Sequence, residues 1–309
     1  MTEVTNLVKR YKDLIALDHF NLSVKDGEIF GLLGPNGSGK TTAINCILSL
    51  LKYDKGEIYL FGKPMTPESY DIKQKIGVVM QNVAVFNELT VAENVDYFCG
   101  LYVGDQKKRR ELVEEALVFT SLQDYRKFRP RKLSGGLLRR LNIACGIAHK
   151  PELIFLDEPT VAVDPQSRNS ILEGIRRLNQ QGATIVYTSH YMEEVEQICS
   201  RIMIMDHGHE VATGTKEELK SMIRTGEKLT IEVPGLPEAL LQQIRKLDGI
   251  LTASYDGEKL LASCRIGDHA IIEVLDLLRK NRLVLGRVFS EPPTLNDVFL
   301  EITGKQLRD

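Results

Sequence analysis

The chain has 309 residues, of which 43% are hydrophobic and 27% charged, and its formal net charge is −2. This composition is typical of a globular protein with enough apolar material for a core, and the length suits two domains. The near-neutral charge argues against nucleic acid as a partner, and no apolar run approaches the ~20 residues that span a bilayer. The five cysteines are far apart, which indicates free thiols in a reducing compartment.

Over the first part of the chain, strands are predicted to alternate with helices. Buried parallel strands are short apolar runs, whereas helices repeat apolar residues every three or four positions. By these criteria the predicted elements are strands within 1–30, a helix over 41–51, helices over 91–121 with a charged break at 104–111, a helix over 137–150, a strand over 152–159, a helix over 167–182 and a strand over 183–190. This alternation implies an α/β fold with a parallel sheet covered by helices.

The pattern changes near Gly214, and the rest of the chain is predicted to form a second domain. Its elements are strand 228–233, helix 237–247, strand 250–255, hairpin turn 256–259, strand 260–266, helix 268–281, strand 282–289 and a closing helix 294–303. The order βαββαβ is that of a ferredoxin-like α+β module. We therefore expect two domains, residues 1–215 and 216–309.

The stretch "GPNGSGKT" matches the phosphate-binding loop Gly-x-x-x-x-Gly-Lys-Thr, and a predicted strand precedes it while a helix follows. Glycines let backbone N–H groups turn toward phosphate oxygens, and the helix points its positive end to the same place. Lys40 would reach the β- and γ-phosphates of ATP, and the Thr41 hydroxyl would bind Mg²⁺. The residues expected to hold the nucleotide here are Gly34, Asn36, Gly37, Ser38, Gly39, Lys40, Thr41 and Thr42.

The apolar stretch "LIFLDE" ends in two acids, Asp157 and Glu158. Beside a phosphate loop, Asp157 is expected to hold Mg²⁺, directly or through water, and Glu158 to polarise the attacking water. Two surface acids at a strand end are the alternative interpretation.

In their order and spacing, these motifs and "LSGGLLRR" make residues 1 to about 215 resemble the ATPase subunit of an ABC transporter. The resemblance implies a P-loop cassette with a parallel-sheet core, an antiparallel β subdomain and a helical subdomain. It implies an ATP-hydrolysing subunit that powers a separate integral membrane permease from the cytoplasmic face of the membrane. Two cassettes would pair head-to-tail around two ATP molecules, and homodimer and heterodimer both remain open.

The same resemblance assigns further residues. Tyr11 would stack on adenine, and Gln81 would sense Mg²⁺ and water and link to the membrane partner. Ser134, Gly135 and Gly136 form the signature loop, which would close on the γ-phosphate held by the opposite subunit. Asp164 would lie in the loop that crosses the dimer seam, and His190 would be the switch histidine near the γ-phosphate. With Lys40 and Glu158, Gln81 and His190 are the expected catalytic groups, and Thr41, Gln81 and Asp157 the expected metal ligands.

Two positions depart from the family pattern. Leu137 stands where the signature usually has glutamine, and Ala162 stands where the seam loop usually has glycine. Ala162 is compatible with the fold only if its φ is not positive. An apolar residue followed by arginines, and the ending "EPPTLNDVFLEITGK", are similar to the branch that exports drugs and antibiotics. The resemblance therefore implies an exporter of drugs, peptides or lipids.

Two questions stay open in the sequence. Residues 82–100 include Val85, Phe86 and Leu89, which either face the permease or pack inside the helical subdomain. The alternative function is a non-transport ABC ATPase that acts on ribosomes or DNA. Such proteins usually carry two cassettes or a long coiled coil, and neither pattern is present here.

Overall fold

The structure is a computed structural model that describes residues 1–223, 226–265 and 270–304. The chain divides into two compact units, the first formed by Met1–Thr215 and the second beginning at Lys216. Within the described residues, none of the helices combines the length and the apolar character needed to cross a membrane. Residues 266–269, which the predicted strand over 260–266 and the helix over 268–281 reach into, lie outside the described residues.

Six strands form the central sheet of the first unit. In sheet order they are β10 (His209–Gly214), β9 (Arg201–Asp206), β3 (Ile29–Leu33), β8 (Thr184–Ser189), β7 (Leu153–Asp157) and β6 (Ile76–Val79). All neighbours pair in parallel except β10 and β9, which pair antiparallel. Strands β3, β7 and β8 are buried along their whole length, as apolar runs covered on both faces should be. The predicted parallel sheet is confirmed.

A second sheet of the same unit is antiparallel. Its strands, in sheet order, are β2 (Leu14–Val24), β1 (Thr2–Tyr11), β4 (Lys55–Leu60) and β5 (Lys63–Pro64). With helix α1 (Lys40–Ile47) and the central sheet, these strands enclose a core that includes Phe20, Ile44 and Phe155. This sheet is the expected antiparallel β subdomain.

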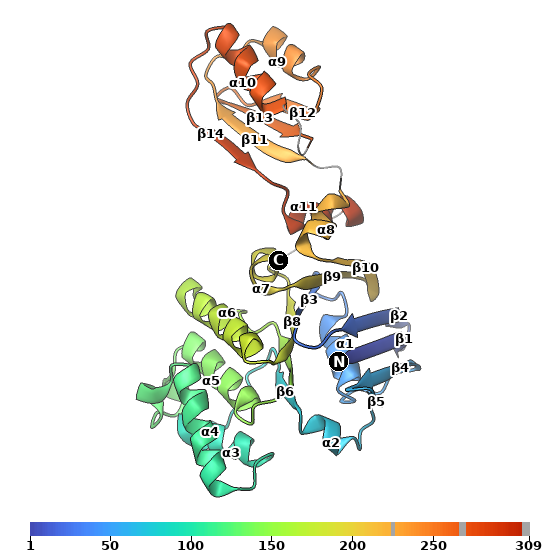
Figure 1. Cartoon of the computed structure of the whole chain (residues 1–309), viewed down its shortest axis with the longest axis vertical. Coiled ribbons are helices and arrows are strands. Elements are labelled where there is room, and N and C mark those ends of the chain that lie inside the picture. The colour runs from blue at the N-terminus through green and yellow to red at the C-terminus, as the bar shows by residue number, and fades with distance from the viewer. Residues whose placement is uncertain (224–225, 266–269, 305–309) are drawn as a thin grey trace. The chain divides into compact units, whose positions relative to one another are not determined.

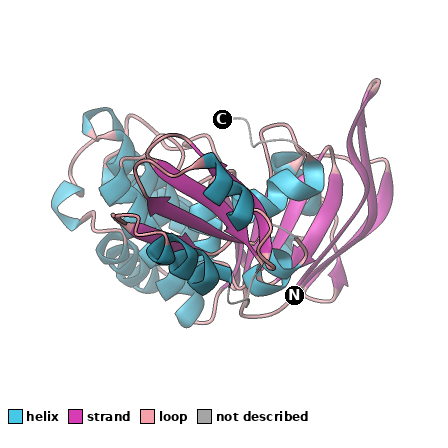
Figure 2. Cartoon of the chain, turned by 90° about the horizontal axis from the view of Figure 1, so that it is seen from above, coloured by secondary structure: helices cyan, strands magenta, loops and turns pink. Residues whose placement is uncertain are grey.

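The other helices of this unit include a separate helical subdomain. In chain order they are α2 (Tyr70–Lys73), α3 (Val91–Gly100), α4 (Gln106–Phe119), the 3₁₀ turns η1 (Gln123–Tyr125) and η2 (Pro130–Lys132), α5 (Gly135–Ile147), α6 (Pro165–Gln180) and α7 (Met192–Ile198). Helices α3, α4 and α5 share a core that contains Val95, Leu117 and Leu141. Figures 1 and 2 show these helices gathered on the side away from the antiparallel strands β1, β2 and β4.

The second unit has the predicted βαββαβ order. Its elements are α8 (Lys216–Ser221), β11 (Glu227–Glu232), α9 (Glu238–Ile244), β12 (Ile250–Tyr255), β13 (Lys259–Cys264), α10 (Ala270–Lys280), β14 (Val288–Glu291) and α11 (Leu295–Thr303). The four strands pair antiparallel in the order β12-β13-β11-β14. Leu240 of α9 and Val274 of α10 pack with Ile231 of the sheet into one core. The ferredoxin-like prediction is confirmed.

Two predicted elements differ clearly from the structure, and the helix predicted over 41–51 ends early, at Ile47. The charged stretch 104–111 is not a break beyond Asp105, because that side chain accepts a hydrogen bond from the N–H of Lys108 and caps α4, which begins at Gln106. The predicted strand over 282–289 is a strand only from Val288. Arg282 has a φ of 58°, which is incompatible with extended backbone, so the chain turns before it pairs with β11.

Candidate ATP-binding site

The strand order of the central sheet places four predicted site loops along one edge. Neighbouring strands β3, β8, β7 and β6 run in parallel, so their carboxyl ends lie side by side. The loops that follow them begin with Gly34, His190, Glu158 and the Met80–Gln81 pair, respectively. In open α/β sheets, ligands bind at this carboxyl edge. Four motifs that lie far apart in the sequence therefore meet because of the topology.

The phosphate loop has the backbone geometry that its glycines predict. Gly37 and Gly39 have φ values of 82° and 107°, in the region that favours glycine. A side chain at Gly34 is excluded, since its Cβ would lie 2.2 Å from the carbonyl oxygen of Met205. Ser38 is buried, and its Oγ has no hydrogen-bond partner in the structure. A buried unpaired hydroxyl in a glycine-rich cradle suits a ligand rich in acceptor oxygens.

The ammonium of Lys40 is folded back over this loop. Its Nζ donates to the carbonyl oxygens of Gly34 at 2.8 Å and Pro35 at 3.1 Å, and lies 3.4 Å from Oε1 of Glu158. Burial lowers the pKa of Lys40 from its ordinary value, and the nearby carboxylates of Glu158 and Asp157 act in the opposite direction. A buried cation that is only partly compensated by carboxylates is suited to an anionic ligand.

Asp157 is completely buried at the end of β7 and connects two hydroxyls. Thr41 Oγ1 donates to its Oδ2 at 2.9 Å, and Thr188 Oγ1 donates to its Oδ1 at 2.6 Å. The parallel register sets Asp157 opposite Thr188, and the phosphate loop brings Thr41 from the other side. Two of the three predicted metal ligands, Thr41 and Asp157, are therefore in direct contact.

The carboxylate of Glu158 is the meeting point of the predicted catalytic groups. Gln81 Nε2 donates to its Oε2 at 3.2 Å, and His190 Nδ1 lies 3.4 Å from the same oxygen. Lys40 approaches the other oxygen, and the Glu158 side chain is 6% exposed. Three residues predicted separately thus surround the buried carboxylate of a fourth, Glu158.

The signature loop and the seam loop lie against each other. Gly136 is buried, and a Cβ there would be 2.5 Å from Ser167 Oγ and 3.1 Å from Oδ2 of Asp164. Asp164 caps α6 by accepting from the N–H of Ser167 at 2.9 Å, which lowers the pKa of its carboxyl. At Gly135 the space is open, since the nearest atom to a Cβ would be 3.7 Å away. Gly136 therefore lets the signature loop approach the seam loop closely, and Gly135 leaves the backbone of the signature loop accessible.

Tyr11 lies apart from this cluster at the end of β1, with 45% of its surface exposed. Lys9 Nζ is 4.9 Å from the centre of its ring. An exposed aromatic face next to a cation is compatible with stacking on a base.

The side chain of Leu137 is directed into the helical subdomain. Its N–H donates to Ser134 Oγ at 3.3 Å, and its half-buried side chain packs against the core of the helical subdomain. We expect Leu137→Gln to leave ATP turnover within about threefold of the native rate, because the phosphate-facing atoms stay in place. Steady-state ATPase assays check this, and a many-fold rise in turnover would mean that Leu137 weakens the site.

The condition for Ala162 is not met, because its φ is 59°, in the left-handed region. A residue other than glycine in this region strains the folded state by ~1–2 kcal/mol. Glycine avoids this strain but lowers the free energy of unfolding by ~0.4–1 kcal/mol, because it increases the entropy of the unfolded chain. We therefore expect Ala162→Gly to stabilise the fold by up to ~1 kcal/mol in denaturant unfolding. Ala183→Gly provides a control at a buried alanine without positive φ, and it should destabilise.

Sequence reasoning missed two residues that complete the site. Thr188 holds Asp157, and Arg139 donates to the carbonyl oxygens of Met80, Gln81 and Glu158. The signal for Arg139 was its place in the helix, since it lies on the buried side between Gly136 and Asn142. The signal for Thr188 was its position two residues before His190 on a strand next to "LIFLD".

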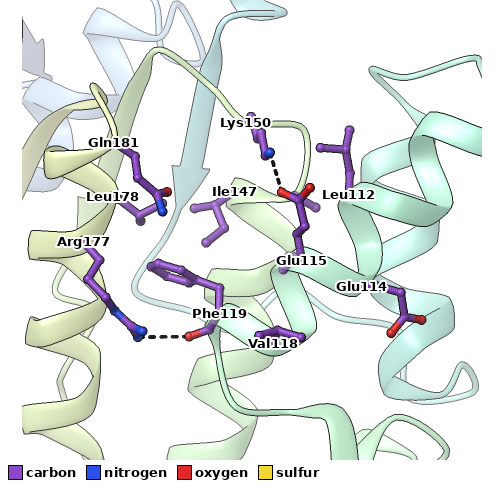
Figure 3. A pocket seen from close by; sticks show the side chains of 12 residues that line it. Leu112, Glu114, Glu115, Val118, Phe119, Ile147, Lys150, Arg177, Leu178 and Gln181 are labelled. Carbon is purple, nitrogen blue, oxygen red and sulfur yellow. Dashed lines mark hydrogen bonds and ion pairs between the residues drawn. The ribbon is translucent and has the colours of Figure 1, made fainter.

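A separate cavity of about 430 Å³ opens between α4, the end of α5 and α6 (Figure 3). Phe119 and Leu178 line it, and Glu115 forms an ion pair with Lys150 at its edge. None of the residues predicted to bind the nucleotide lines this cavity. It is distinct from the candidate site.

The family model that matches the chain is that of the ABC transporter, over residues 17–161. The chain is 39% identical to the linearmycin resistance ATP-binding protein LnrL of Bacillus subtilis (strain 168), over 100% of both chains. It is 34% identical to the daunorubicin resistance ATP-binding protein DrrA3 of Streptomyces coeruleorubidus, over 97% of this chain and 95% of the relative. The dimeric post-hydrolysis cassette MJ0796 bound to ADP and Pi superposes with a TM-score of 0.65 at 29% identity, over 70% of this chain and 98% of that chain.

The chain thus belongs to the ABC transporter family. It is an ATP-binding, ATP-hydrolysing subunit that powers a separate membrane-spanning chain, and the predicted cassette fold is confirmed. The alternative of a ribosome- or DNA-acting ATPase finds no support among these relatives.

Proposed function

We propose that the chain drives an exporter of drugs, peptides or lipids, with Glu158 as the residue that polarises the attacking water. The observation that carries the catalytic assignment is the convergence of Gln81, His190 and Lys40 on this one carboxylate, within 3.2 to 3.4 Å. Phosphoryl transfer depends mainly on positioning and charge neutralisation. Lys40 and His190 would neutralise the γ-phosphate, while Gln81 and Glu158 orient water.

The nucleotide would lie in the phosphate loop, on the backbone N–H groups of Gly34 and residues 36–42. ATP oxygens would replace the loop carbonyl oxygens as acceptors for the ammonium of Lys40, and would accept a hydrogen bond from the unpaired Ser38 hydroxyl. Among the residues that the structure describes, no group of three or more His, Cys, Asp or Glu side chains could hold a metal ion. Mg²⁺ needs only one or two carboxylates together with phosphates and water, so Thr41, Asp157 and Gln81 fit it. Bound there, Mg²⁺ would neutralise charge on the phosphates.

The signature loop would complete the ATP site of a second cassette. Gly135 offers an open backbone, and Ser134 lies at the N-terminus of the 13-residue helix α5, where anions are favoured. Asp164 would lie at the seam, and Tyr11 would stack on adenine in its own site. The dimeric cassette MJ0796 supports this pairing. The ATP-binding unit would be residues 1–215, with 216–309 as an accessory domain.

The permease would dock on the helical subdomain. A cavity of about 580 Å³ there is lined by residues of α3 and α4, among them Tyr97, and by Leu89 just before α3. Phe86 is 43% exposed and packs edge-on against Tyr97, with ring centres 4.9 Å apart. Val85 instead packs against the helical core, so the apolar residues of this region divide between docking and packing. The chain would lie at the cytoplasmic face of the membrane through this contact.

Export is supported by the relatives, whose names refer to linearmycin resistance, daunorubicin resistance and Nod factor export. The test is to tag the full chain, isolate it from gently solubilised cells of its own host and identify what accompanies it. We expect a multi-span membrane protein, and strains lacking the chain should accumulate an amphipathic drug or lipid. Co-sedimentation with ribosomes, with no membrane protein present, would contradict the proposal.

Removing the Tyr97 ring should separate docking from nucleotide binding. Tyr97 is 46% exposed beside this cavity, so Tyr97→Ala should cut co-isolation of the permease at least severalfold and leave ATP affinity unchanged. Tyr59→Ala, which removes a 36%-exposed ring from the antiparallel sheet, is the matched control and should keep the permease. Equal loss in both variants would place the docking surface elsewhere.

A further inference from the structure

Arg139 is a buried cation whose hydrogen bonds, within the described residues, all end on main-chain oxygens. The residue is 4% exposed on α5, and its Nη2 donates to the carbonyl oxygen of Glu158 at 2.7 Å. Its Nη1 donates to the carbonyl oxygens of Met80 at 3.0 Å and Gln81 at 2.8 Å. The planar fork of a guanidinium can hold two loops at a fixed separation, which the single ammonium of a lysine cannot do as well.

The loop residue that Arg139 holds has a strained backbone. Glu158 has a φ of 46°, and non-glycine residues persist in such conformations only where their surroundings fix them. Its N–H donates to the carbonyl oxygen and to Oγ1 of Thr188, at 3.2 and 3.0 Å. Its carbonyl oxygen is held by Arg139. Thr188 and Arg139 thus clamp the two sides of the residue whose carboxylate meets Gln81, His190 and Lys40.

Packing alone does not require an arginine here. A buried charge is costly, and an apolar side chain of similar volume is often at least as stabilising. Burial lowers the pKa of Arg139, with the charges of Asp157 and Glu158 acting in the opposite direction. The free-energy cost of burying this charge is consistent with a role in positioning the two loops. All three hydrogen bonds of Arg139 end on the loops that carry the proposed water-orienting side chains.

We propose that Arg139 is a positioning residue for ATP hydrolysis, which fixes the Glu158 backbone and the Gln81 loop to the helix that begins at the signature loop. This inference rests on the proposed role of Glu158. Arg139 lies about one helical turn after Ser134–Gly136 on α5. A displacement of the signature loop would therefore be transmitted by the Arg139 side chain to the Glu158 carboxylate of the same chain.

The test is a double-mutant cycle on the full chain, with single-turnover hydrolysis of radiolabelled ATP followed over hours. Arg139→Gln should lower the hydrolysis rate about 10²-fold, with ATP affinity within about threefold of native, since the guanidinium donates to main-chain oxygens outside the phosphate loop. In the Glu158→Gln background the same change should cost little more, because Arg139 acts through Glu158. Arg139→Lys should recover part of the rate, and the same cycle with lysine serves if the glutamine variant does not fold.

Asn142 is the matched control. It is buried one helical turn later, donates to the Met80 carbonyl oxygen at 3.3 Å and accepts from the N–H of Ala84, but it does not reach Glu158. Asn142→Ala should slow hydrolysis less than about tenfold, with no coupling to Glu158→Gln. The inference is overturned if Arg139→Gln costs the same factor in both backgrounds, or weakens ATP binding as much as it slows hydrolysis. Native turnover in Glu158→Gln alone would instead refute the proposed function.

Discussion

Glu158→Gln is expected to slow ATP hydrolysis by about 10²- to 10⁴-fold while ATP binding persists, because an amide cannot accept a proton from water as a carboxylate can. The substitution keeps the volume and the hydrogen bond from Gln81 Nε2, which lies 3.2 Å from the carboxylate. It removes the negative charge beside Lys40, so the anionic nucleotide should bind at least as tightly. The variant should therefore accumulate as an ATP-bound dimer.

Two measurements check this expectation together. Steady-state phosphate release reports turnover, and equilibrium titration with a fluorescent ATP analogue reports affinity. Glu173→Gln makes the same chemical change at an exposed position of α6 and should behave as native. Turnover at the native rate in Glu158→Gln would show that another group orients the water, and equal loss of binding would mean that the pocket itself had changed.

Gly135→Asp is expected to abolish ATP-driven pairing of cassettes and to reduce turnover about 10²- to 10³-fold, with little change in melting temperature. The nearest atom to a Cβ at this position is 3.7 Å away, so the side chain fits the free chain. In the pair, its carboxylate would face the γ-phosphate bound by the other subunit. Two like charges ~4 Å apart repel by about 4 kcal/mol at an effective dielectric constant of ~20.

The neighbouring glycine gives the contrast. Gly135→Ala adds only a methyl group in open space and should retain most activity. Gly136→Ala places its Cβ 2.5 Å from Ser167 Oγ, so it should lower stability as well as activity. Analytical ultracentrifugation with ATP in the Glu158→Gln background, where nucleotide should be consumed only slowly, measures the pairing directly. Normal dimerisation of Gly135→Asp would remove the signature loop from the proposed interface.

Much of the fold was predictable, because its signals are local. The apolar runs of β7 and β8 and the glycine-lysine-threonine loop before α1 predicted the parallel sheet and the position of the phosphate loop. The pairing of Thr41 with Asp157 follows from the topology once these strands lie side by side. The order βαββαβ likewise predicted the sheet of the second unit.

Other features depended on tertiary contacts that no local pattern encodes. The residues of "VAVDP" do not themselves indicate that Ala162 has a positive φ, although the glycine that the family usually has at this position is compatible with one. The arginines of "LLRR" resemble a charged surface, but Arg139 is buried because three carbonyl oxygens converge on it. The start of β14 was misplaced since residues 282–287 are apolar enough for a strand, while Arg282 turns the backbone.

The close approach of Gly136 to Ser167 has a consequence for how the cassette evolves. The loop that would grip a partner's ATP meets the first turn of α6 at Ser167, and Arg140 Nη2 reaches the same serine at 3.3 Å. Neither segment can shift alone without opening a gap or a clash there. A mutation that enlarges residue 167 would be felt at the signature loop, so these positions should change together or not at all as the family diverges.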